Sequence, residues 1–145
     1  MKPIQLPQPA PDANYSSLDP LDSRYYDPEI ARYLSEQSRI AYQAYVEAAL
    51  ARTLAEFGVC SAEAAAQIEE AAAKVTAADV VAEEKTTKHD VKALVNVIKA
   101  SLPEEAKPYV HFGATSYDIV ATAMSLQLRD AVREVVVPRL TELEN

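Results

Sequence analysis

Two adjacent hydroxyl residues, Thr115 and Ser116, stand at the start of a long apolar-periodic run, within the segment His-Phe-Gly-Ala-Thr-Ser-Tyr-Asp at 111–118. Thr115 and Asp118 have the spacing of a capping box, which predicts a helix start. The first turn of a helix offers free N–H groups and a partial positive charge, and the hydroxyls add donors, so this segment suits an anion. Gly113 allows close backbone approach just upstream. The plainer alternative is that Thr115 or Ser116 only caps the helix.

A second candidate segment, Thr-Thr-Lys-His-Asp at 86–90, repeats the same capping spacing. Thr87 and Asp90 predict another helix start, with His89 in the first turn. The positive helix end favours a neutral imidazole ring, and Lys88 adds positive charge beside it. The alternative is an exposed cap that carries an incidental histidine. His111, in an apolar setting, is interpreted as a packed, hydrogen-bonded ring.

A third candidate, Arg24 with Tyr25, could clamp a phosphate. A guanidinium forms bidentate charge-assisted bonds, and the phenol adds a donor. The pair lies in a polar stretch whose Asp-Pro dipeptides favour turns. The alternative is a surface arginine and a core tyrosine. We expect neither a metal site nor a cofactor.

Helical patterns dominate the chain that must position these residues, and no strand pattern is convincing, so we expect an all-α fold. Residues 1–14 carry four prolines, which predict an extended tail. The predicted helices are Pro28–Phe57 ended by Gly58, Ala62 to about Val75, a short turn over Val80–Glu84, about His89–Ala100, and Ser116 to the end with a bend at Pro138. The water-facing side of the first is predicted to carry Arg32, Glu36, Arg39, Gln43 and Glu47.

The last predicted helix is apolar over a wide arc, which calls for partners on several sides. Its apolar residues are Val120, Ala123, Met124, Leu128, Ala131, Val132, Val135 and Val136. The chain ends at Asn145 without supplying such partners. We therefore expect three parts: a tail over 1–14, a helical domain over 15–112, and the beginning of a helical-bundle domain over 113–145.

Composition narrows the function classes. The 145 residues are 49% hydrophobic and 25% charged, as in ordinary globular proteins. A net charge of −8 argues against nucleic acid as a partner. No apolar run is long enough to span a bilayer, and no signal-peptide pattern is present. The single cysteine, Cys60, fits a reducing cytoplasm.

Three segments, in order and spacing, resemble the N-terminal part of adenylosuccinate lyases, which belong to the fumarase/aspartase superfamily. They are Leu-Asp-Pro-Leu-Asp-Ser-Arg-Tyr at 18–25, Thr-Thr-Lys-His-Asp-Val-Lys-Ala at 86–93, and the segment at 111–118. The resemblance implies an N-terminal helical domain followed by the first long helix of a central bundle. It implies a homotetramer that eliminates fumarate from adenylosuccinate, leaving AMP, and from the succinylated aminoimidazole carboxamide nucleotide of purine biosynthesis.

The resemblance also implies seven substrate-binding residues: Arg24 and Tyr25 for the phosphate, Lys88, His89 and Asp90 as substrate contacts, and Thr115 and Ser116 for a succinyl carboxylate. His89 is a candidate auxiliary to proton transfer. The family's principal acid is a histidine in a later Thr-His motif, and its base is a serine in a later mobile loop. Neither motif occurs in these 145 residues. The chain alone is therefore expected to be inactive.

Two other functions remain open. One is a helical interaction module that has lost catalysis and binds a partner through the apolar face of its last helix. The other is a lyase of the same superfamily with a different substrate. Competition by AMP would discriminate, because neither alternative requires a nucleotide.

Overall fold

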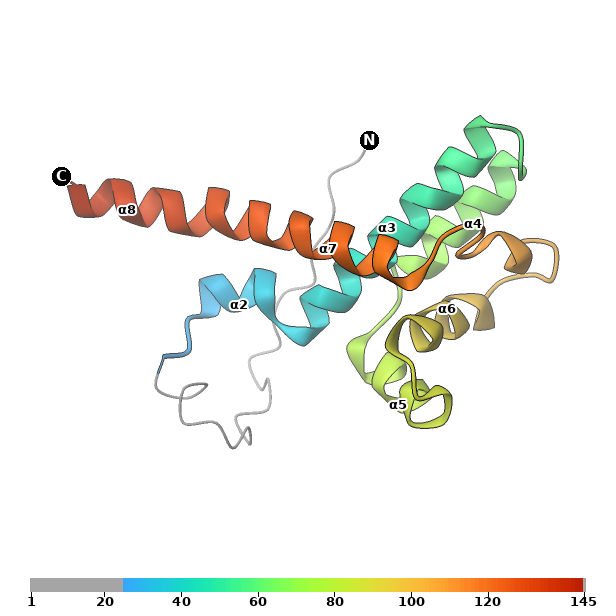
Figure 1. Cartoon of the computed structure of the whole chain (residues 1–145), viewed down its shortest axis with the longest axis horizontal. Helices are drawn as coiled ribbons and strands as arrows, with labels where there is room; N and C mark the ends of the chain where they lie inside the picture. The colour runs from blue at the N-terminus through green and yellow to red at the C-terminus, as the bar shows by residue number, and fades with distance from the viewer. Residues whose placement is uncertain (1–24, 145) are drawn as a thin grey trace.

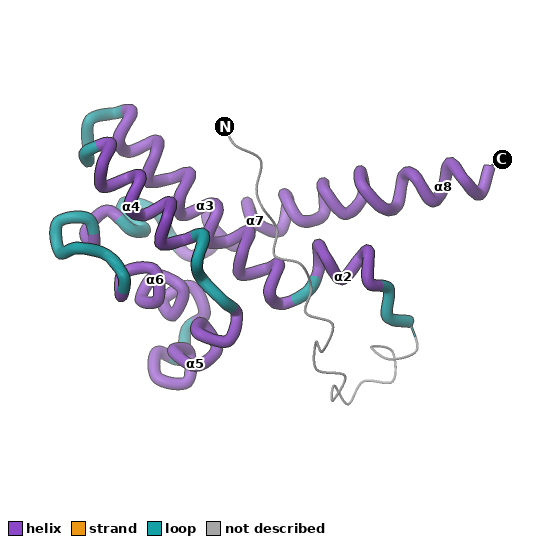
Figure 2. Tube along the Cα trace, turned by 180° about the vertical axis from the view of Figure 1, so that it is seen from behind, coloured by secondary structure: helices purple, strands orange, loops and turns teal. Residues whose placement is uncertain are grey.

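The structure, a computed structural model, describes residues 25–144, and these form only helices and connecting loops (Figures 1 and 2). This confirms the all-α prediction. The predicted tail over 1–14 and Arg24 lie outside the described residues. The helices are α2 Pro28–Leu34, α3 Glu36–Glu56, α4 Ala62–Ala72, α5 Ala77–Thr87, α6 Asp90–Ala100, the 3₁₀ turn η1 Lys107–Tyr109, α7 Ser116–Ala131, the π-helical segment η2 Val132–Val136, and α8 Val137–Glu144.

The main core lies among α3, α4, α5, α6 and the first turns of α7. Branched side chains from different helices are fully buried there, among them Ile40, Ile68, Leu94 and Ile98. Alanines line the facing sides of α3 and α4, and their small side chains let the two helices run close together (Figure 1). This core holds α6 and the start of α7 in fixed positions.

The first long helix was predicted to be continuous, and this prediction is wrong at Ser35, which separates α2 from α3. The Ser35 hydroxyl accepts a hydrogen bond from the N–H of Ser38 at 3.3 Å, while the Ser38 hydroxyl donates to the carbonyl of Arg32 at 2.6 Å. These side chains compete with the helical backbone ladder and start a new helix. The predicted beginning at Pro28, which Asp27 caps, and the predicted end at Gly58, which has φ +71°, are confirmed.

The helix α5 is longer than predicted, and α4 ends earlier, at Ala72. Thr76 caps α5 by accepting the N–H of Asp79 on its hydroxyl at 3.2 Å. The Ala-Ala-Asp segment at 77–79, upstream of the short turn predicted over Val80–Glu84, is therefore the first turn of a helix. A local capping hydroxyl decided the boundary.

The segments α7, η2 and α8 form one long continuous rod that projects beyond the other helices (Figure 1). The π-helical turns of η2 lie just upstream of Pro138, where a bend is predicted. Proline cannot donate a backbone hydrogen bond, and its ring crowds the carbonyl four residues earlier, at Glu134. A wider turn relieves that crowding.

The rod has one covered side and one exposed side. Ile119, Ala123, Ala131 and Val135 are buried against α2, α3 or the core, and the side chain of Gln127 donates to the carbonyl of Tyr33 on α2 at 2.9 Å. The exposed side carries Met124, Leu128, Val132, Val136, Val137, Leu140 and Leu143. These seven residues are called the exposed stripe below. No helix between residues 25 and 144 has the length and apolar content needed to cross a membrane.

Candidate functional site

Two helix N-termini meet at the contact between His89 and Ser116. His89 is the N-cap of α6, and its Nδ1 accepts the backbone N–H of Lys92 at 3.3 Å. Its other ring nitrogen, Nε2, lies 3.4 Å from the hydroxyl oxygen of Ser116, the first residue of α7. Nδ1 also lies 3.4 Å from Oδ1 of Asp90, and in the neutral tautomer in which Nδ1 accepts the Lys92 N–H the ring proton is on Nε2. The imidazole therefore presents an N–H beside the Ser116 hydroxyl, where two positive helix ends converge.

The capping box predicted at the start of α7 is confirmed. The backbone N–H of Thr115 donates to a carboxylate oxygen of Asp118 at 2.9 Å. Gly113 has φ +76°, but a Cβ built there would have open space around it. The glycine is therefore required by the backbone conformation, and close approach of an anion to Gly113 stays a prediction. The turn at Gly113 directs the chain into α7.

The capping pair predicted at Thr87 and Asp90 is wrong. Lys88 adopts the left-handed conformation, with φ +54°, and its N–H closes α5 by donating to the carbonyl of Glu84 at 2.8 Å. Thr87 therefore belongs to the end of α5, and its hydroxyl donates to the carbonyl of His89 at 3.1 Å. His89 takes the capping position in its place.

Asp90 connects the site to Arg39 on α3, a residue predicted to lie on the water-facing side of its helix. One Asp90 oxygen accepts the N–H of Val91 at 2.7 Å, and the other lies 3.6 Å from the Arg39 guanidinium on α3. Arg39 also forms two hydrogen bonds to Glu36, at 2.9 and 2.6 Å, which hold the pKa of the Glu36 carboxyl below its usual value. In the sequence, only the i, i+3 spacing of Glu36 and Arg39 indicates that this arginine forms an ion pair.

His111, on the loop before α7, is partly buried and pairs with the fully buried Glu47. The Nδ1 atom of His111 lies 2.6 Å from the Oε1 atom of Glu47 on α3, so His111 is the hydrogen-bonded ring that was predicted. Glu47 is 0% exposed and Gln43 is also buried, so their predicted position on a water-facing side is wrong. The cause is tertiary packing. Both α4 and α7 pack on α3, so more of the α3 surface is buried than the single apolar side that the sequence pattern predicts. Burial raises the pKa of the Glu47 carboxyl, and the bond to His111 opposes that shift.

The structure thus brings His89, Asp90 and Ser116 together, with Thr115 adjacent. Tyr25 lies before α2, is 71% exposed, and forms no hydrogen bond to His89 or Ser116 in the part of the chain that the structure describes. Its phosphate-binding role remains a prediction, as does that of Arg24. Lys88 is exposed beside the site, and its substrate contact also remains a prediction.

The groups that converge here are mostly hydrogen-bond donors: an imidazole N–H, a hydroxyl and the first-turn N–H groups of α7, with a guanidinium behind Asp90. Such donors suit the oxygens of carboxylates and phosphates. Within residues 25–144, no three His, Cys, Asp or Glu side chains gather as a group that could hold a metal ion.

The sequence is similar to several curated enzymes. The adenylosuccinate lyase of Methanocaldococcus jannaschii is 36% identical over 98% of this chain and 31% of that protein. The adenylosuccinate lyase of Archaeoglobus fulgidus is 44% identical over 87% of this chain and 28% of that protein. The N-acetyl-S-(2-succino)cysteine lyase of Enterococcus italicus is 34% identical over 80% of this chain and 26% of that protein. The chain thus spans about a third or less of the length of these relatives.

The fold is similar to that of a solved enzyme structure, and a family model matches the sequence. The 3-carboxy-cis,cis-muconate lactonizing enzyme of Pseudomonas putida has a TM-score of 0.66 and 36% identity, covering 79% of this chain and 27% of that one. The family model is described as Lyase and matches residues 24–145. With this match and the shared all-helical fold, the chain belongs to the lyase family of the fumarase/aspartase superfamily, and it resembles the N-terminal part of adenylosuccinate lyases.

Proposed function

We propose that this chain supplies part of the substrate site of an adenylosuccinate lyase, a carbon–nitrogen lyase that eliminates fumarate from adenylosuccinate to leave AMP. The same site would act on the succinylated aminoimidazole carboxamide nucleotide of purine biosynthesis. The observation that carries the proposal is the contact between His89 and Ser116 at the meeting N-termini of α6 and α7. Both residues lie in segments that resemble the family's substrate-binding segments.

The donors at this contact fit the charge that such an elimination develops. β-Elimination removes a proton from a carbon next to a carboxylate and breaks the bond from the adjacent carbon to nitrogen. Negative charge spreads onto the carboxylate as the proton leaves. Donors fixed before the reaction stabilise this growing charge, which is how an oxyanion hole works. We assign the succinyl carboxylate to Thr115 and Ser116.

The remaining substrate contacts follow from the same proposal. Lys88, His89 and Asp90 would contact the substrate, and His89, with an N–H directed at Ser116, would assist as a polar contact and auxiliary to proton transfer. Arg24 and Tyr25 would hold the nucleotide phosphate.

We propose that the 145-residue chain does not turn over adenylosuccinate alone. The family's later Thr-His and mobile-loop motifs, which carry the principal acid and base, do not occur in it. In the proposed enzyme the chain works within a cytoplasmic homotetramer, whose sites combine residues from different subunits. A turnover assay on the purified chain tests this point, since measurable cleavage would contradict it.

Ligand titration of the ¹⁵N-labelled chain tests the binding site. Fumarate should shift the amide resonances of Ser116 and His89, and AMP should bind competitively with adenylosuccinate. Ser116→Ala should weaken fumarate binding about tenfold, the size expected for one hydrogen bond to a charged group. Ser125→Ala makes the same change on the exposed side of α7 and should leave binding unchanged. If neither fumarate nor AMP moves any resonance near His89, the substrate-site proposal is wrong.

A second candidate function is a lyase for a different succinylated or carboxylated substrate. The similarity to the Enterococcus italicus lyase, named for an N-acetyl-S-(2-succino)cysteine substrate, favours keeping it. Binding of fumarate without binding of AMP would support this candidate over the nucleotide lyase. The interaction-module alternative rests on the exposed stripe, and it predicts that neither ligand binds.

A further inference from the structure

Glu47 is a buried ionisable group to which the proposed reaction assigns no role. Its Oε1 atom lies 2.6 Å from His111 Nδ1, and its Oε2 atom has no hydrogen-bond partner in the described part of the chain. Gln43, one turn earlier on α3, likewise has a buried side-chain oxygen without a partner there. Burying a carboxylate is costly, and an apolar residue of similar volume often gives equal or greater stability. Stability alone therefore does not account for Glu47.

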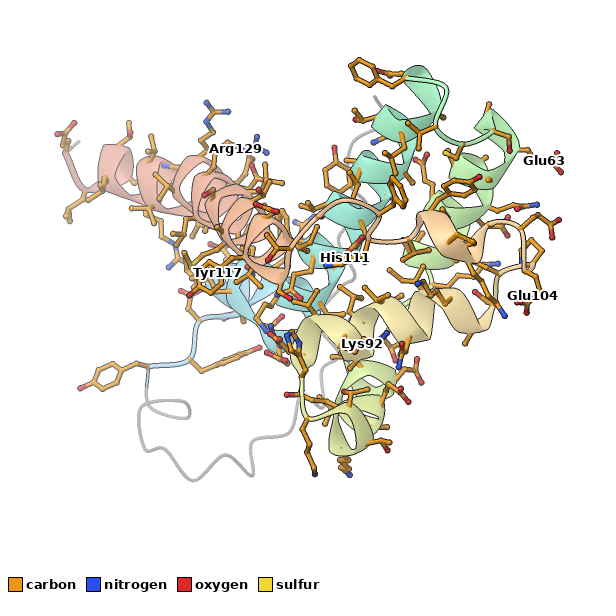
Figure 3. The ribbon with its side chains drawn as sticks, turned by 45° about the vertical axis from the view of Figure 1, so that its right-hand side comes forward. Glu63, Lys92, Glu104, His111, Tyr117 and Arg129 are labelled. Carbon is orange, nitrogen blue, oxygen red and sulfur yellow. The ribbon has the colours of Figure 1, made fainter. Side chains whose placement is uncertain are left out.

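His111, the partner of Glu47, has an unusual backbone. Its φ is +64°, and between residues 25 and 144 only Lys88 among the other non-glycine residues has a positive φ. A left-handed residue that is not glycine costs free energy and persists only where its surroundings hold it. The bond to a buried carboxylate on a long helix is such a constraint. Figure 3 shows His111 on the loop that leads into α7, beside α3.

A short path connects His111 to Ser116. The carbonyl of His111 accepts the N–H of Ala114 at 3.4 Å, and Gly113, with φ +76°, completes the turn between them. Thr115 follows directly as the N-cap of α7. His111 therefore anchors the loop five residues before Ser116, in addition to the core contacts that hold the start of α7.

We propose that Glu47 is a positioning residue that acts through His111 to hold the loop over 111–116, so that the Ser116 hydroxyl faces His89. Glu47 touches no substrate in this proposal. The purpose of this positioning, which is to let Ser116 bind a substrate carboxylate, rests on the proposed function. The geometric link between Glu47 and Ser116 does not.

The test compares Glu47→Gln with Glu56→Gln in the 145-residue chain by NMR. Both remove one carboxylate from α3, but Glu56 is exposed at the far end of the helix. In Glu47→Gln, the His111 ring nitrogens and the amides of Ser116 and His89 should shift, while the amide of Ile68 on α4 should not. Fumarate affinity should fall about tenfold, as expected when one charge-assisted hydrogen bond is lost. Glu56→Gln should change none of these signals.

A structural role without positioning would give a different result. Glu47→Gln would then alter the melting temperature, yet the Ser116 and His89 amides and the fumarate affinity would match the wild type, and the proposal would be overturned. If Glu47→Gln does not fold, His111→Gln breaks the same bond from the loop side and is judged by the same resonances. If the wild type does not bind fumarate but Ser116 and His89 still move in Glu47→Gln, the proposed function fails and the positioning link stands.

Discussion

The helical core around α3–α6 and the outer part of the rod, η2 and α8, use similar apolar residues in opposite ways. In the core, Ile68, Leu94 and Ile98 are fully buried between helices. In the rod, Leu140 and Leu143 are 55% and 82% exposed. Burial of apolar surface is the main source of folding free energy, so the core stabilises the chain, and the outer rod contributes little. The difference separates residues that hold the site from residues that remain available to a partner, such as the bundle helices of the proposed tetramer.

The largest expected effect comes from truncating a core leucine. Leu94→Ala should lower the free energy of unfolding by about 2–5 kcal/mol, because it removes fully buried apolar contacts and leaves a cavity. Leu140→Ala makes the same chemical change in the rod and should change it by less than about 0.5 kcal/mol. Urea unfolding followed by circular dichroism measures both values. Equal costs at the two positions would show that the rod is covered in solution and would erase the distinction.

A smaller effect is expected at Tyr42, which joins the core to the second half of α7. Its ring is buried and its hydroxyl donates to a carboxylate oxygen of Asp130 at 2.9 Å. Tyr42→Phe should cost about 1.5 kcal/mol of unfolding free energy, the usual size for a hydrogen bond to a charged group. Tyr117→Phe, at an exposed position on the same helix as Asp130, is the control. An unchanged stability in Tyr42→Phe would mean that the bond to Asp130 does not help to hold α7 on α3.

The pH dependence of stability should have opposite signs at two carboxyl groups. Burial raises the folded pKa of Glu47 above 4.5. Its contribution to the free energy of unfolding is therefore present below pH 4.5 and is lost as pH rises through the folded pKa. Glu36 has a folded pKa below 4.5 because of Arg39, so its contribution is present above pH 4.5 and is lost as pH falls. Unfolding curves measured across pH should show the stability of Glu47→Gln rising relative to that of the wild type as pH rises. The same trend in Glu56→Gln would contradict this assignment.

The smallest effect is expected at Arg139, which ties α8 to α2 through ion pairs with Asp27 and, at 2.6 Å, with Glu29. The pairs are solvent-exposed, and such pairs contribute little. Arg139→Gln should lower the melting temperature slightly at low salt and not at all at about 1 M salt, where charges are screened over a few ångströms. Arg133→Gln, on η2, serves as the charge-matched control. If Arg139→Gln lowers the melting temperature equally at low and high salt, the arginine stabilises the fold through packing of its aliphatic stem and not through its ion pairs.

Local spacing predicted much of the fold and part of the site. The all-α class, the cap of α7 at Thr115 and Asp118, and the end of α3 at Gly58 depend on residues within a few positions of one another. The burial of Glu47 could not be predicted in this way, because it depends on two helices packing on α3. The approach of Arg39 to Asp90 depends likewise on where α3 lies relative to α6, and the contact of His89 with Ser116 depends on how α6 and α7 pack.

The π-helical turns of η2 affect the direction in which the later side chains of the rod point around the helix axis. Along a regular α-helix, side chains four residues apart drift round the axis by about 40° at each step, since each residue turns about 100°. Leu128, Val132, Val136 and Leu140 follow that four-residue spacing across η2. A wider turn rotates the later residues backward and keeps them on one side. Since a π-helical turn holds about one residue more than an α-helical turn, deleting one residue from η2 should restore a regular helix and leave the direction of the α8 leucines nearly unchanged, whereas the same deletion in α7 would swing them by about 100° about the axis.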